Sequence, residues 1–278
     1  MRYSPPPPEL REYVSSLYEL RQEVATYDET ERSDRPQLRI LLSGSGEYIF
    51  PDGHCDQASR TIILGPTSGS VRGMGIGPMH VVGAGLLPPA WVAMMGKSAD
   101  TALDRALDAE QLFGDAATRL FHAVQGTQST DERFRLISAF VAEATSKADP
   151  AQIAFTHIVD AWLTSSADPR IEALVEASGL SVRQLERMTR RYYGLPPKTL
   201  SRKYRALKAA MLIARGEDIE ASEMADSFYD QSHLIRELKR FAGLTPQQIM
   251  RRESYLMAEI ATGRGALRGQ VGPLVSDA

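Results

Sequence analysis

Two short stops, GLPP at 194–197 and GLTP at 243–246, most constrain how this chain of 278 residues can fold. Each stop follows a basic run whose apolar residues recur every three or four positions, which is the spacing of an amphipathic helix. Glycine ends a helix cheaply because it adopts positive φ without strain, and proline cannot continue the helix. The chain therefore contains one design twice, a basic helix with a sharp end.

Both basic helices begin at a residue suited to capping. Ser181 stands three residues before Gln184, which is the S-x-x-Q spacing of a capping box. In the second run, FYDQSHLIRELKRF, Asp230 occupies the corresponding N-cap position, with Phe228 before it and Leu234 after it. We therefore predict helix caps at Ser181 and Asp230, and we read Asp230 as a cap rather than a general base.

A further helix precedes the first unit and another joins the two units. Ile171, Leu174 and Val175 supply one buried face before Gly179, a natural C-terminal cap. The resulting helix, glycine turn and capped helix is the layout of a helix-turn-helix, although most short helix pairs with a glycine turn are simply structural. Residues 197–216 then read as one long amphipathic helix whose start is crowded with cations, among them Lys203, which suits phosphate.

The charge distribution divides the chain. Residues 1–180 hold 15 Lys and Arg against 24 Asp and Glu, whereas residues 181–252 hold 15 against 8. The whole chain has a net charge of -3, so the basic section is local. Such a section favours a polyanionic partner, and the alternative is a solvated basic helical surface.

The front of the chain has a different pattern. Between residues 37 and 87, short apolar runs alternate with Gly, Pro, Asp and Ser, which predicts a β-sandwich or barrel. Residues 10–27 fit either helix or strand, and PPAWVAMMG predicts a helix entered through proline and closed by Gly96. Residues 99–165 read as helical, and SKADP at 146–150 reads as a linker.

These patterns predict an α+β chain in four parts. We expect a β-rich sensor or ligand-binding domain at 1–98, a helical linker or dimerisation region at 99–149, a double helix-turn-helix domain at 150–257 and a mobile, glycine-rich tail at 258–278. The one cysteine, Cys55, fits a reducing cytoplasm. No apolar run approaches the roughly 20 residues of a membrane helix, and the N-terminus lacks the apolar core of a signal peptide.

The rear of the chain resembles the AraC-type transcription regulators. The resemblance covers about residues 155–255 and is strongest in FYDQSHLIRELKRFAGLTP, with GLSVRQLERMTRRYYGLPPKTLSRKYRALKA matching the first unit and the joining helix. It implies a seven-helix domain whose two helix-turn-helix units enter successive major-groove segments. The front half resembles, less specifically, the cupin-like sensor domains that precede this module. The partners implied are double-stranded DNA, a small-molecule effector, a second copy of the chain and RNA polymerase, without a cofactor.

The same resemblance carries over to particular residues. It implies base-facing side chains from the first unit at Arg183, Glu186 and Arg187, and from the second unit at Gln231, Ser232, His233 and Arg236. Their chemistry suits guanine, adenine and cytosine edges. Four further cations, Arg190, Lys203, Lys239 and Arg240, complete the set that we predict to bind DNA.

The chain departs from the family pattern at three positions. Val175 stands where the family usually has alanine, and Ser227 replaces a glycine. The helix expected before Phe228 is either about two residues short or has Glu223 at its small-residue position.

Other chemistries find little support. His54, Cys55 and His80 have metal-ligand character but lack an H-x-H pair, so we expect no metal. GPTSG at 65–69 lacks the spacing of a nucleophile elbow. We therefore expect no enzyme, and the alternatives are a cupin-type binding protein or enzyme and a non-specific architectural DNA protein. The cupin-type alternative would need a site among Glu47, Asp52, His54, Asp56, Arg60, Arg72 and His80.

Overall fold

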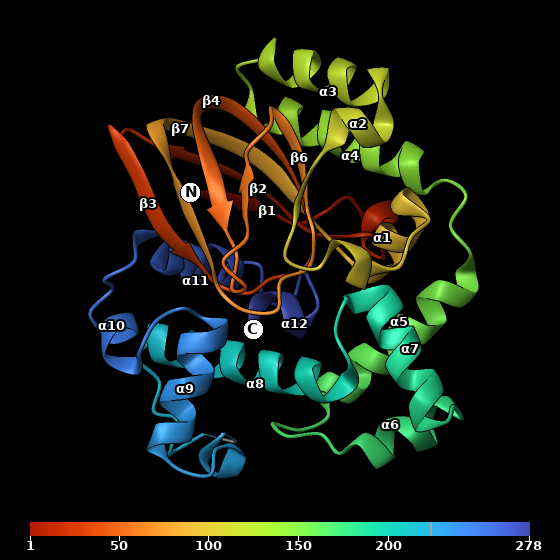
Figure 1. Ribbon diagram of the computed structural model, residues 1–278, viewed down its shortest axis with the longest axis vertical. Helices are drawn as coiled ribbons and strands as arrows, with labels where there is room; N and C mark the ends of the chain where they lie inside the picture. The colour runs from red at the N-terminus through yellow and green to blue at the C-terminus, as the bar shows by residue number, and fades with distance from the viewer. Residues whose placement is uncertain (223) are drawn as a thin grey trace.

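The front of the chain forms one curled antiparallel sheet (Figure 1). The computed structural model describes residues 1–222 and 224–278. The principal strand order is β1-β2-β7-β4-β6-β8, with β3 beside β7 and β5 beside β4. The strands are β1 (Arg2–Ser4), β2 (Val14–Gln22), β3 (Thr26–Glu31), β4 (Gln37–Ile49), β5 (Cys55–Gln57), β6 (Thr61–Leu64), β7 (Val71–Leu86) and β8 (Ala106–Asp108).

The two long strands make the sheet curl. The first half of β7 pairs with β3 and its second half with β2, while β4 runs beside β7 over almost its whole length. The register of β4 shifts on both sides of Ser43, and such irregularities bend and twist a strand. The predicted β-rich front is therefore confirmed, as one curled sheet rather than the two layers of a sandwich.

Helices cover one end of the sheet. Proline begins α1 (Pro88–Met95) and Gly96, at φ 60°, ends it, as predicted. The region after it is less helical than its pattern predicts, because Ala106–Asp108 pairs with β6 as the edge strand β8. This region also contains η2 (Ala99–Ala102), α2 (Ala109–Phe113), α3 (Asp115–Gln125) and α4 (Thr130–Thr145).

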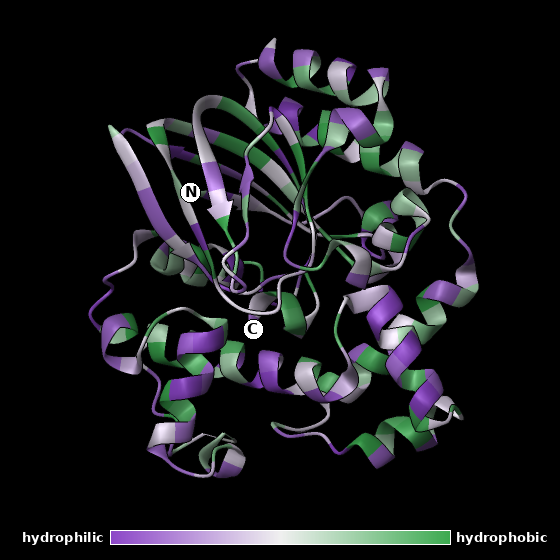
Figure 2. Ribbon diagram, in the orientation of Figure 1, coloured by the Kyte–Doolittle hydropathy of each residue, from purple (hydrophilic) through white to green (hydrophobic). Residues whose placement is uncertain are grey.

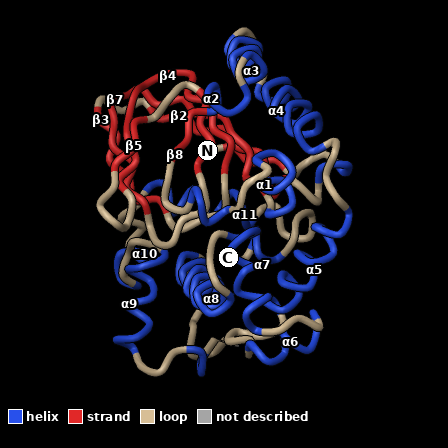
Figure 3. Tube along the Cα trace, turned by 45° about the vertical axis from the view of Figure 1, so that its right-hand side comes forward, coloured by secondary structure: helices blue, strands red, loops and turns tan. Residues whose placement is uncertain are grey.

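The rear of the chain is helical, as predicted. The linker at 146–150 ends at the cap residue Asp149, and α8 lies between α7 and α9 in both views (Figures 1 and 3). The helices are α5 (Pro150–Thr164), α6 (Ile171–Ser178), α7 (Val182–Tyr193), α8 (Pro197–Ala214), η3 (Ala225–Ser227), α9 (Gln231–Phe241), α10 (Pro246–Met250), α11 (Tyr255–Gly265) and α12 (Pro273–Ser276).

Among the described residues before Phe228, the expected helix is present only as the single 3-10 turn η3. Gly216, at φ 76°, follows the end of α8, and side chains then bond to nearby backbone, Asp218 to Glu220 N–H and Ser222 to Met224 N–H. Asp and Ser side chains compete in this way with helical hydrogen bonds. The seven-helix expectation thus fails at this position, and the departure predicted at Glu223 lies outside the described residues.

Residues 258–278 are packed, which corrects the prediction of a mobile tail. Leu274 and Ala278 are buried. The guanidinium of Arg35 donates to the carbonyl of Leu274 at 2.9 Å, and that of Arg32 donates to the carbonyl of Ala278 at 2.6 Å. The glycine content alone could not reveal these contacts, because they come from residues more than two hundred positions earlier.

One hydrophobic core runs through both halves of the molecule. Leu38 and Trp91 of the front half belong to the same buried cluster as Leu185, Leu207 and Phe241 of the rear half. The sheet therefore holds the helical half through a packed interface. Over residues 1–222 and 224–278, no helix is both long and apolar enough to cross a bilayer.

Candidate nucleic-acid interface

The first capped helix, α7, is built as its sequence predicts. Ser181 Oγ accepts from Gln184 N–H, and the Gln184 side chain accepts from Ser181 N–H at 2.9 Å, so both capping-box hydrogen bonds are present. Gly194, at φ 77°, caps the other end. Leu174 of α6 and Leu185 of α7 are fully buried, whereas Val175 is only partly buried against the same core. The unit is a helix-turn-helix with a firm scaffold.

The outer face of α7 carries four predicted DNA-binding residues. Arg183, Glu186, Arg187 and Arg190 are all exposed, and their spacing places them on one side of the helix. Hydrophilic residues predominate along this helix (Figure 2). The face opposite the core is thus free to meet a partner.

The second capped helix, α9, has the same organisation. The Asp230 carboxylate accepts from His233 N–H at 2.6 Å, which confirms the predicted cap. Leu238 and Phe241 are fully buried. Gln231, Ser232, Arg236, Lys239 and Arg240 are exposed.

His233 differs from its neighbours on α9. It is half-buried, its ring lies against Phe228 with the centroids 5.7 Å apart, and its Nδ1 accepts from the N–H of Tyr229 at 3.2 Å. Nδ1 of His233 is thus engaged within the helix cap. His233 is therefore as much a part of the helix cap as of the outer face.

Lys203 does not lie on the exposed faces of the helices, which corrects its assignment as a phosphate contact. Its side chain is buried, and Nζ donates to the carbonyls of Asp34 at 2.7 Å and Thr67 at 3.1 Å. Burial lowers the pKa of Lys203 to about 7. Cations surround the start of α8 on several sides, so the sequence could not show which of them the sheet would cover.

The sheet domain also forms hydrogen bonds with the C-terminal end of α9. The N–H of Ser70 donates to the carbonyl of Arg240 at 2.8 Å, and the N–H of Ser33 donates to that of Phe241 at 2.6 Å. These carbonyls lie at the helix end, where no intrahelical partner exists. Ser70 belongs to the segment Gly65–Ser70 between β6 and β7, called here the junction loop.

A cluster of buried charges lies at the same interface. Arg264 of α11 pairs with Asp34, and Arg32 lies 4.0 Å from the same carboxylate. Burial would raise the pKa of Asp34, but the charges of Arg264 and Arg32 hold it well below its ordinary value. Nε and Nη1 of Arg32 are buried without a hydrogen-bond partner. The single carboxylate of Asp34 therefore compensates the charges of two guanidinium groups, those of Arg264 and Arg32.

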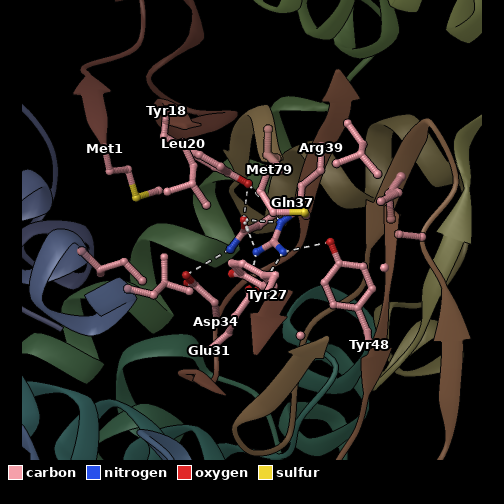
Figure 4. Close-up of a pocket in the computed structure, with 18 of the residues that line it drawn as sticks. Met1, Tyr18, Leu20, Tyr27, Glu31, Asp34, Gln37, Arg39, Tyr48 and Met79 are labelled. Carbon is pink, nitrogen blue, oxygen red and sulfur yellow. Dashed lines mark hydrogen bonds and ion pairs between the residues drawn. The ribbon is translucent and has the colours of Figure 1, made fainter. Parts of the chain in front are cut away.

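A cavity of about 60 Å³ lies between the sheet and α11 (Figure 4). Arg39 occupies its floor, paired with Glu31 at 2.6 Å and hydrogen-bonded to Tyr18, Gln37 and Tyr48. Apolar walls come from both the sheet and the helix, and Arg32 reaches the same cavity. The residues of these apolar walls include Leu20, Tyr27, Met79, Leu256 and Ile260.

The residues weighed for other chemistries are dispersed. His54 pairs with Asp56 at the surface, whereas His80 and Arg133 share Glu19. Arg72 pairs with Asp28 in an exposed position. Across the described parts of the chain, no three His, Cys, Asp or Glu side chains gather as a metal site.

Sequence reasoning missed the charged residues of β3 and the segment after it. Glu31, Arg32, Asp34 and Arg39 all line the cavity, and they lie just before or at the start of residues 37–87, the region of predicted strand pattern. The only signal was the charge-rich text ETERSDRPQLR inside a region of strand pattern, where charges that flank strands are usually solvated.

The chain was compared with known proteins. A family model described as a helix-turn-helix domain matches residues 174–252. No curated protein matches the chain.

Solved structures of two proteins are among those that match the chain. ToxT from Vibrio cholerae O395, bound to (E)-4-(8-methylnaphthalen-1-yl)but-3-enoic acid, is 11% identical with a TM-score of 0.48, covering 93% of this chain and 100% of that one. The AraC-like transcriptional activator CuxR is 16% identical with a TM-score of 0.33, covering 72% of this chain and 78% of that one. The match to the family model and the two capped helices together identify the C-terminal segment, residues 174–252, as a helix-turn-helix domain.

Proposed function

We propose that the protein is a sequence-specific DNA-binding transcription regulator that reads DNA with α7 and α9. The observation that carries this proposal is the pair of capped helices whose exposed faces are polar and cationic, at the two ends of α8. The 18 residues of α8 span about 27 Å at 1.5 Å per residue. This is close to the roughly 34 Å that separates successive major-groove segments.

The exposed side chains suit base edges. Arg183, Arg187 and Arg236 can each donate two hydrogen bonds to guanine O6 and N7. Gln231 suits adenine N6 and N7, and Glu186 accepts from cytosine N4. Arg190, Lys239 and Arg240 are exposed along the same two helices and suit phosphate, which sets position rather than sequence.

We also propose that the cavity beneath α11 holds a small effector. The segment Glu31–Asp34 lines the cavity and continues directly into the contacts with α8 and α9, so a ligand there has a short route to the DNA-reading helices. Nε and Nη1 of Arg32, which together carry three N–H groups without a partner, favour a ligand with an acidic group, because buried donors gain most from a charged acceptor. Dimerisation through residues 99–149 and contact with RNA polymerase stay predictions.

The test is selection of bound DNA from a random pool with the full chain, followed by band shifts with the selected site. We expect one sequence to be preferred over random competitor, with affinity that falls as salt rises. Equal affinity for all sequences would favour the architectural alternative. Absence of any shift at low salt would favour the cupin-type binding protein or enzyme.

The effector part has its own test. Melting temperature is measured with decanoic acid and with 1-decanol, which share an apolar chain but differ in charge. We expect the acid alone to stabilise the protein and the variant R32Q to lose that response. Equal stabilisation by both compounds would contradict the assignment of Arg32.

A further inference from the structure

The junction loop touches all three helices on which DNA reading depends. Pro66 packs against Gly194 at the end of α7, so closely that a Cβ on Gly194 would lie 2.6 Å from the proline Cγ. The Thr67 carbonyl accepts from Lys203 of α8, and Ser70 N–H donates to Arg240 at the end of α9. Three residues of this six-residue loop, Pro66, Thr67 and Ser70, therefore contact both DNA-reading helices and the helix between them.

The junction loop is itself held firmly. The Asp104 carboxylate accepts from the N–H of Ser68 at 2.8 Å and from its hydroxyl at 2.6 Å. Thr67 Oγ1 accepts from the N–H of Asp34 at 2.8 Å. Gly65 has no room for a side chain, because an added Cβ would lie 1.9 Å from the carbonyl oxygen of Ala102. A loop fixed on both flanks can position the elements that rest on it.

The second helix-turn-helix unit, which contains α9, depends on contacts with other parts of the molecule. Among the described residues its first helix is reduced to η3, so α9 packs against an irregular segment that includes Met224 and Phe228, in place of the regular helix that α6 gives to α7. Instead, Arg202 of α8 pairs with Glu237 of α9 at 2.7 Å, and the sheet domain holds the end of α9 through Ser33 and Ser70. The orientation of α9 relative to α7 therefore depends on the sheet domain as well as on α8.

We propose that the junction loop is a positioning element that sets the spacing between the two DNA half-sites that the chain accepts. The inference rests on the proposed function. One added base pair moves the second half-site by about 3.4 Å along the duplex and about 35° around it. Helices held by the junction loop as well as by α8 cannot follow this displacement, whereas helices joined only through α8 can adjust to it.

The experiment uses the full chain and the site obtained by selection, with the distance between half-sites changed by one base pair in each direction. The test variant carries two glycines inserted between Ser68 and Gly69. The matched control carries the same insertion after Gly53, in an exposed turn where an added Cβ would touch nothing within 4 Å. A second variant, P66G/S68G, loosens the junction loop without lengthening it and serves if the insertion prevents folding.

We expect wild type and control to lose about tenfold in affinity at either altered spacing, and the junction-loop variants to lose no more than about threefold. Affinity for a single half-site should be the same for all four proteins, which a merely destabilised protein would not show. The inference is overturned if the variants keep the wild-type preference, or if wild type accepts all spacings equally. Failure of wild type to bind any DNA would instead overturn the proposed function.

Discussion

Nζ of Lys203 lies 2.7 Å from the backbone carbonyl of Asp34, joining the helix between the two DNA-reading helices to the sheet. This contact buries a cation beside Arg35 and Arg32, with the carboxylates of Asp34 and Asp104 also near. The link between the two halves is thus made by a charged group in an environment that disfavours its charge.

Lys203 makes stability depend on pH. Because burial lowers its pKa from 10.5 to about 7, the folded protein binds fewer protons than the unfolded chain between those values. Stability therefore rises with pH across that window, by at most about 1.4 kcal/mol per pH unit. We expect K203M to remove this slope in urea unfolding between about pH 7 and pH 9.5, while the control K198M, at an exposed position of the same helix, keeps it.

Arg187 and Arg236 should carry sequence preference. Each is exposed on a DNA-reading helix, and loss of a bidentate contact to a base costs about 1–3 kcal/mol. We expect R187A and R236A each to weaken binding to the selected site by that amount and to relax preference at different positions of it. Band-shift titrations measure both effects, with R72A in the sheet domain as the control, and uniform weakening on all DNA would assign these residues to phosphate instead.

The Glu31–Arg39 pair should matter to stability far more than its exposed neighbour on β3. Both side chains are about nine-tenths buried, and removal of one partner leaves the other charge uncompensated. E31Q should cost about 3–5 kcal/mol of unfolding free energy. D28N breaks the exposed pair with Arg72 and should cost under about 1 kcal/mol, and equal losses in urea titrations would show that the Glu31 carboxylate is better solvated than its burial indicates.

The two caps should differ in their effect on DNA binding. S181A and D230A each remove one cap hydrogen bond and should cost about 1 kcal/mol of unfolding free energy. Since α9 lacks a scaffold helix and His233 belongs to its cap, D230A should also weaken DNA binding, whereas S181A should change binding less. Urea unfolding and band shifts on the same two variants decide, and equal effects on binding would contradict the dependence of α9 on its cap.

Local rules predicted the elements of the helical half well. Ser181, Gly194 and Asp230 cap their helices through neighbours three or four residues away. The local sequence is therefore enough to predict their capping roles. The same holds for Gly96 after α1. Periodicity also identified which faces of α7 and α9 are buried, because apolar residues recur every three or four positions along each helix.

Long-range packing set the limit of sequence reasoning. Lys203 and Arg202 are adjacent in the text, yet Lys203 is buried under the sheet and Arg202 pairs with Glu237 of α9. Residues 106–108 form a strand only because β6 offers an edge to pair with. No local pattern distinguishes these outcomes, since each depends on a segment far away in the chain.

The last long helix, α11, forms a wall of the cavity whose other walls come from strands near the start of the chain. On the ribosome, β8 emerges with about 150 residues still to be made before α11. At the usual rate of about 5–20 residues per second, that interval lasts roughly 7–30 s. During it, Leu20, Tyr27 and Met79 face water on the open side of the young sheet. Until α11 is made, the apolar face of this sheet is therefore open to aggregation, the hazard that transiently exposed apolar surface carries.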